Sequence, residues 1–83
     1  MEKKPLPLKF KSSEEIRDWR HKHQMNQAEF WARVGVTQSG GSRYETGRNI
    51  PKSVQILLTV TYGTDKQLEK MLEALRDWPS PLL

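Results

Sequence analysis

Two short helical patterns, separated only by the tripeptide Gly35-Val36-Thr37, constrain the fold of this chain more than any other feature. Asn26, with a glutamate three residues later, predicts the start of a helix over residues 27–34, and the glycine of the tripeptide ends that helix because it adopts a positive φ at little cost. The threonine then caps a second helix over residues 38–45. A glycine turn of this length sets two helices roughly perpendicular, so residues 27–46 are predicted to form a helix-turn-helix.

Three further helical patterns flank this pair. A first helix begins at Ser12, where a glutamate three residues later predicts a capping box, and ends near His23. A fourth covers residues 52–61 and is rich in apolar residues. A fifth is capped by Thr64 and continues to Trp78, with apolar residues at three- and four-residue spacing. No segment alternates apolar and polar residues over any length, so the predicted class is all-α, with five helices.

The two ends of the chain carry no helical pattern. Residues 1–11 hold two prolines and four lysines, and we expect an extended basic arm or a disordered tail, with a short edge strand over residues 8–11 as a further alternative. Residues 12–78 form the predicted domain, and residues 79–83 follow as a C-terminal tail. At 83 residues the chain has room for one domain with one modest core.

Charge is unevenly distributed along the chain. The formal net charge is +4, and residues 1–52 carry 11 Lys and Arg against 6 Asp and Glu, whereas residues 53–83 carry 3 against 4. The excess of positive charge in residues 1–52 predicts that one face of the domain is turned toward a polyanion.

The chain has no cysteine, which excludes disulfides and thiolate metal sites, and it has neither an apolar run of roughly 18 residues nor a secretory start. These absences favour a cytoplasmic protein.

Three short runs stand in order along the middle of the chain: Asn26-Gln27-Ala28-Glu29, Val34-Gly35-Val36-Thr37-Gln38-Ser39, and Tyr44-Glu45-Thr46-Gly47-Arg48 followed by Pro51. In these runs the sequence resembles the Cro/CI (XRE) family of helix-turn-helix phage repressors. With the flanking helices, the resemblance covers residues 14–62. It implies a five-helix lambda-repressor-like domain that places the helix over residues 38–45 in the major groove of double-stranded DNA.

The resemblance also implies which side chains contact DNA. Four are expected to contact base edges: Gln38, Ser39, Ser42 and Arg43. Six are expected to contact phosphates: Asn26, Gln27, Thr37, Arg48, Asn49 and Lys52. Gln38 occupies the position that bonds an adenine edge bidentately, Gln27 is also expected to brace Gln38, and Arg43 is expected to reach a guanine or a phosphate. The alternative is that these side chains form an ordinary solvated helix face.

Two pairs of residues are expected to be structural. The family usually has a small alanine where this chain has Trp31 and a branched apolar residue where it has Gly41, and the two positions face each other. Exchanging large for small on both sides roughly conserves volume, so we expect the Trp31 indole to pack over Gly41. Arg20 and Glu45 occupy positions at which family members often have a buried ion pair, here tying the first helix to the third.

The sequence therefore predicts a sequence-specific repressor that binds a palindromic operator as a homodimer in the cytoplasm and is associated with the nucleoid when bound. Trp78, Leu82 and Leu83 supply additional apolar surface for a twofold interface. Two alternatives remain open, an antitoxin with a toxin partner and a protein-interaction module of the same fold. We expect no enzymatic activity, cofactor or small-molecule ligand, and no metal, because His21 and His23 point to different faces of a helix.

Overall fold

The computed structural model describes residues 6–77, and this part of the chain is all-α with no strand. Its five helices are α1 (Ser13–Lys22), α2 (Gln27–Ala32), α3 (Gln38–Glu45), α4 (Lys52–Tyr62) and α5 (Asp65–Arg76). The predicted class and number of helices are thus confirmed. The predicted end of the fifth helix at Trp78 and the tail at residues 79–83 lie outside the described residues.

The helix boundaries follow from the N-cap residues of the sequence. Four caps accept a hydrogen bond from the backbone N–H three residues later: Ser12, Asn26, Thr37 and Thr64. The box at Thr64 is complete, since the Gln67 side chain accepts from the Thr64 N–H at 2.8 Å. The capping box expected at Ser12 is incomplete, because the Glu15 carboxylate accepts a hydrogen bond from the Lys11 N–H, at 2.8 Å, and not from the Ser12 N–H.

α2 is shorter than the predicted range of residues 27–34. After Ala32 the hydrogen bonds tighten to three-residue spacing, with Val34 N–H donating to the Trp31 carbonyl at 3.1 Å and Gly35 N–H to the Ala32 carbonyl at 3.0 Å. Gly35 then takes a φ of 76°, the left-handed conformation for which a glycine is preferred. The turn therefore begins two residues before the glycine that signals it.

The core is built largely from aromatic side chains of α1, α2 and α4. Phe30 and Tyr62 stack with ring centroids 4.4 Å apart, and the Tyr62 hydroxyl donates to the Phe30 carbonyl at 2.6 Å. Trp19 packs against both rings, and Ile16 and Leu58 are each 1% exposed. Burial raises the pKa of Tyr62 further above neutral pH, and its hydroxyl is the donor in this bond.

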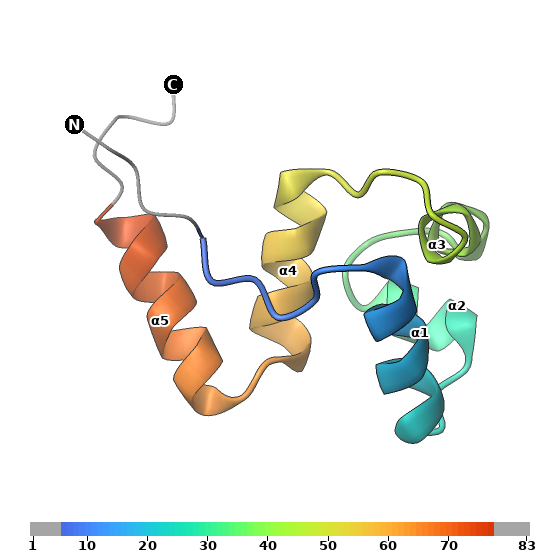
Figure 1. Cartoon of the computed structure of the whole chain (residues 1–83), viewed down its shortest axis with the longest axis horizontal. Helices are drawn as coiled ribbons and strands as arrows, with labels where there is room; N and C mark the ends of the chain where they lie inside the picture. The colour runs from blue at the N-terminus through green and yellow to red at the C-terminus, as the bar shows by residue number, and fades with distance from the viewer. Residues whose placement is uncertain (1–5, 78–83) are drawn as a thin grey trace.

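The segment before α1 belongs to the folded domain, which corrects the expected boundary at residue 12. Phe10 is only 6% exposed and lies in the core, edge-on to Trp19 and Phe30. The Lys9 N–H donates to the Thr59 hydroxyl of α4 at 3.0 Å, and Figure 1 shows the segment crossing α4 between α5 and α1. Residues 6–11 are thus packed chain rather than a free arm, and they form no edge strand, because the Lys9 N–H bonds a side chain and no neighbouring strand. Residues 1–5 lie outside the described part.

Candidate nucleic-acid interface

α2, the turn and α3 form the predicted helix-turn-helix. α2 and α3 are in direct contact, and the Val36 N–H donates back to the Trp31 carbonyl at 3.0 Å, which holds the turn against the end of α2. Thr37 then caps α3 by accepting the Gly40 N–H at 3.0 Å. The short connection therefore fixes where α3 starts relative to α2.

α3 has two chemically different faces. Gly41 and Glu45 are buried on its inner face. Its outer face carries the four side chains predicted to contact bases, of which Ser42 is half-buried and three are exposed: Gln38, Ser39 and Arg43. Because residues four apart lie on the same side of a helix, these four form two adjacent rows. Four hydrogen-bonding side chains on one outer face match what reading base edges requires.

The expected phosphate-contacting side chains lie at the helix starts and in the loop before α4. Five of them are exposed: Asn26, Thr37, Arg48, Asn49 and Lys52. The cap of α2 uses only the side-chain oxygen of Asn26, which accepts the Glu29 N–H at 2.7 Å, so the amide nitrogen is left to donate to an oxygen outside the protein. Gly47, at a φ of 113°, turns the chain from the end of α3 into the loop that carries Arg48 and Asn49.

Gln27 is placed differently from expectation. Its amide donates to the Glu45 carboxylate at 3.2 Å, and within the described residues no hydrogen bond joins it to Gln38. Without DNA, Gln27 thus bonds Glu45, and the brace to Gln38 expected in the DNA complex stays a prediction. The physical reason is that Gln27 is half-buried beside a carboxylate, which is a stronger acceptor than an amide oxygen.

Glu45 is the centre of a buried polar cluster that joins three helices. Arg20 of α1 forms a two-pronged ion pair with it, Nε to Oε2 at 2.9 Å and Nη2 to Oε1 at 2.8 Å. The Trp31 Nε1–H of α2 donates to Oε2 at 2.7 Å. Burial alone would raise the pKa of Glu45, but the hydrogen bonds from Arg20, Trp31 and Gln27 outweigh it and leave the pKa below its ordinary value. Glu45 is thus a fully bonded carboxylate anion.

Trp31 also lies directly over Gly41. The indole is fully buried, and a Cβ added at position 41 would come within 2.7 Å of Nε1 and nearer still to Cγ and Cδ1. Only a glycine leaves room for the ring at this approach of α2 and α3. One tryptophan therefore contacts the inner face of α3 at two successive turns, Gly41 and Glu45.

Comparison with known proteins bears directly on this helix-turn-helix. Residues 17–61, more than half of the chain, match the RsaL-like HTH domain family. The chain belongs to this family. It is accordingly a helix-turn-helix DNA-binding regulator of transcription. The match supports this class but not the specific Cro/CI (XRE) assignment. No curated protein and no solved structure gives a significant match.

Two structural residues, one inside the matched region and one before it, were missed by the sequence reasoning. Arg17 of α1 donates to the backbone carbonyl of Glu45, so it ties down the last turn of α3 beside Arg20. The signal was present, because Arg17 and Arg20 are three residues apart and share a helix face. Phe10 was missed because two prolines and several lysines surround it.

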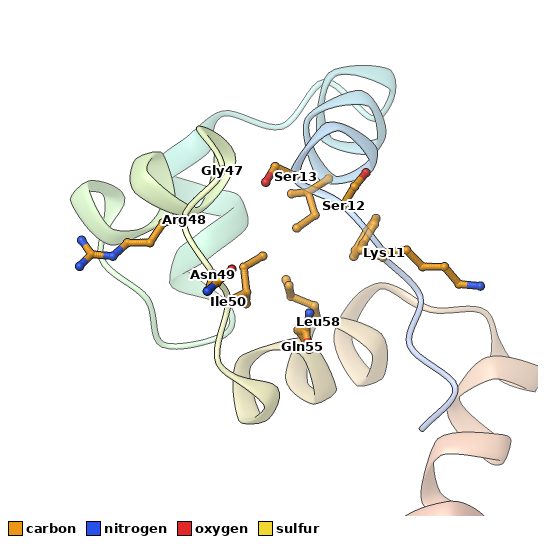
Figure 2. Close-up of a pocket in the computed structure, with 11 residues that line it drawn as sticks. Lys11, Ser12, Ser13, Gly47, Arg48, Asn49, Ile50, Gln55 and Leu58 are labelled. Atoms are coloured by element: carbon orange, nitrogen blue, oxygen red, sulfur yellow. The ribbon is translucent and has the colours of Figure 1, made fainter. Parts of the chain in front are cut away.

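A cavity of about 150 Å³ lies between the first turn of α1, the loop before α4, and α4 itself. Ile16 and Leu58 belong to its apolar lining, and Ser12 and Asn49 to its polar lining. Figure 2 shows the side chains of Arg48 and Lys11 extending away from the cavity.

Within residues 6–77, no group of acidic and histidine side chains is placed to hold a metal ion, and no helix is long and apolar enough to cross a membrane. The RsaL-like HTH domain thus presents its polar outer face of α3 as the strongest candidate site.

Proposed function

We propose that the protein is a sequence-specific transcriptional repressor that binds a palindromic operator as a homodimer and acts by occupying DNA rather than by catalysis. The observation that carries this proposal is that α3 has a buried inner face, which packs on the domain, and an exposed polar outer face. A helix built in this way is suited to lie in the major groove, which is about 12 Å wide and displays a distinct bonding pattern for each base pair.

Each predicted contact has a defined chemical role. Gln38 offers both a donor and an acceptor, which suits the N6 and N7 atoms of adenine, and Arg43 offers the paired donors that suit guanine. Ser39 and Ser42 reach neighbouring bases from the same face. The phosphate contacts of Asn26, Gln27, Thr37, Arg48, Asn49 and Lys52 would set the register and supply affinity that falls with salt.

A twofold dimer is supported by apolar surface on α4 and α5. Leu57 and Val60 are 45% and 36% exposed and lie three residues apart on α4, and Leu72 of the adjoining α5 is 40% exposed. Removing these side chains from water would favour association of two copies. Two copies then place their α3 helices in half-sites about 34–36 Å apart, one turn of DNA.

The first experiment is binding of the purified chain to DNA from its own upstream region across a series of salt concentrations. We expect one preferred site, and we expect Gln38→Ala and Arg43→Ala to lose the preference for it. Lys66→Ala is the matched control, because it removes an exposed positive charge from α5, which lies at the other end of the domain from α3 (Figure 1).

Weak binding that is indifferent to sequence and unchanged by the α3 variants would contradict a repressor. It would favour a protein-interaction module of the same fold. A toxin that co-purifies with a chain that still represses its own promoter would instead identify an antitoxin, for which the exposed apolar residues of α4 and α5 are an available surface.

A further inference from the structure

The contacts of Trp31 bear on how the recognition helix is held. Its ring fills the space over Gly41, and its Nε1–H donates to the Glu45 carboxylate at 2.7 Å, one helical turn further along α3. Two contacts on the same side chain, about 6 Å apart along the helix, resist both translation and rotation of α3 against α2. Trp31 is itself fully buried in the core, against Phe30 and Tyr44.

The rest of the Glu45 cluster holds α3 from the side of α1. Arg20 bonds the Glu45 carboxylate and Arg17 its backbone carbonyl, so the last turn of α3 is fixed to a second helix. No buried polar side-chain atom among residues 6–77 lacks a hydrogen-bond partner. A fully satisfied buried network of this kind selects one arrangement, because every alternative leaves a charge or donor unpaired.

The outer face of α3 moves with the inner face. A rotation of α3 by about 15° would shift side-chain atoms at a radius of about 5–6 Å by about 1.5 Å. Bidentate contacts with a base edge need placement to within about 0.5 Å. The orientation of Gln38 and Arg43 toward DNA therefore depends on contacts made on the opposite side of the helix.

We propose that Trp31 is a positioning residue that determines the base preference of the protein without touching DNA, by setting the rotation of α3 through Gly41 and Glu45. This inference rests on the proposed function, because it concerns how the same helix reads sequence. Loss of the indole N–H should leave phosphate contacts, which come from several elements, largely in place. It should degrade the base contacts, which all come from α3.

The test compares Trp31→Phe with Trp19→Phe in the full chain. Trp31→Phe keeps an aromatic ring over Gly41 but removes the donor to Glu45. Trp19→Phe is the matched control, because Trp19 is a core aromatic of α1 for which the described residues show no hydrogen bond to α3. The best duplex of about 20 base pairs, long enough for two half-sites, is selected from a random library with the wild type, and its Kd is compared with that of a scrambled duplex.

We expect Trp31→Phe to lose about tenfold in the ratio of the two Kd values, with the Kd for the scrambled duplex unchanged within about twofold. The control should keep the wild-type ratio. A merely structural role would lower the melting temperature without changing the ratio for the folded protein, so each measurement is made below the melting transition of that variant. If Trp31→Phe does not fold, Trp31→benzothienylalanine keeps both fused rings and replaces the N–H with a sulfur atom that cannot donate a hydrogen bond.

Each remaining outcome is decisive. An unchanged ratio in Trp31→Phe refutes the positioning role while leaving the proposed function intact. Equal weakening on both duplexes, or an equal loss in Trp19→Phe, shows general destabilisation and also refutes it. A wild type that does not distinguish the selected from the scrambled duplex overturns the proposed function, and the positioning role with it.

Discussion

Replacing Gly41 by alanine is the sharpest test of how α3 is seated on α2. The added Cβ would lie nearer than 2.7 Å to two carbon atoms of the Trp31 ring, whereas carbon atoms in ordinary contact are about 3.5–4.0 Å apart, so the ring or the helix must move by more than about 1 Å. Such overpacking costs about 1–3 kcal/mol, and the bond from Trp31 to Glu45 is disturbed as well. Alanine regains only about 0.5–1 kcal/mol in helix propensity.

We therefore expect Gly41→Ala to lower the free energy of unfolding by about 2 kcal/mol, which corresponds to a fall in melting temperature of about 8–16 °C. Circular dichroism during thermal and urea unfolding measures both quantities.

Gly40→Ala is the matched control, since it makes the same change one residue earlier in the same helix. Its Cβ would meet only side-chain atoms, Val36 Cγ1 at 3.2 Å and Thr37 Oγ1 at 3.3 Å, and these can give by a few tenths of an ångström. We expect this variant to stay within about 1 kcal/mol of the wild type, because the gain in propensity offsets a mild contact. Equal stability of the two alanine variants would refute the close seating of Trp31 on Gly41.

Three further predictions concern the core and the buried carboxylate. Arg20→Ala should cost about 3–5 kcal/mol in urea unfolding, because it leaves Glu45 buried without its ion pair, whereas loss of the exposed Arg33 should cost under about 0.5 kcal/mol. The lowered pKa of Glu45 means that its stabilisation is present above the unfolded-state pKa and is lost as pH falls through the folded-state pKa. Melting temperatures should therefore decline on acidification in the wild type, and Glu45→Gln, less stable at neutral pH, should show a shallower decline. Phe10→Ala should cost about 3–5 kcal/mol, and a change within 0.5 kcal/mol would show that the segment before α1 is an arm after all.

Local signals in the sequence were sufficient to predict the helices. Each N-cap side chain accepts a hydrogen bond from a backbone N–H three residues later, and this bond fixes where the helix begins. The effect of a cap is therefore local, as it is at Ser12, Asn26, Thr37 and Thr64. The outer face of α3 was predictable for a similar reason, since four-residue spacing on a helix fixes which side chains are neighbours.

Other features depended on residues distant in the chain. Phe10 was expected in an arm, because nothing within its own stretch of prolines and lysines shows that α1, α2 and α4 leave a space for its ring. The bond from Gln27 to Glu45 was likewise not expected. Glu45 lies 18 residues further along the chain, and only the packing of α2 on α3 brings its carboxylate to the Gln27 amide.

The sequence by itself determined the helical class, the helix-turn-helix and the polar face that α3 turns outward. The packing of Trp31 over Gly41 and the pairing of Arg20 with Glu45 were also expected, from the resemblance. The tertiary structure decided the remaining contacts that hold α3, which are the bond from the Trp31 indole to Glu45 and the bond from Arg17 to the Glu45 carbonyl. The physical reason is the separation along the chain over which each interaction acts. Caps and periodicity act along the chain, whereas the packing of a ring and the satisfaction of a buried charge depend on every group that the fold brings around them.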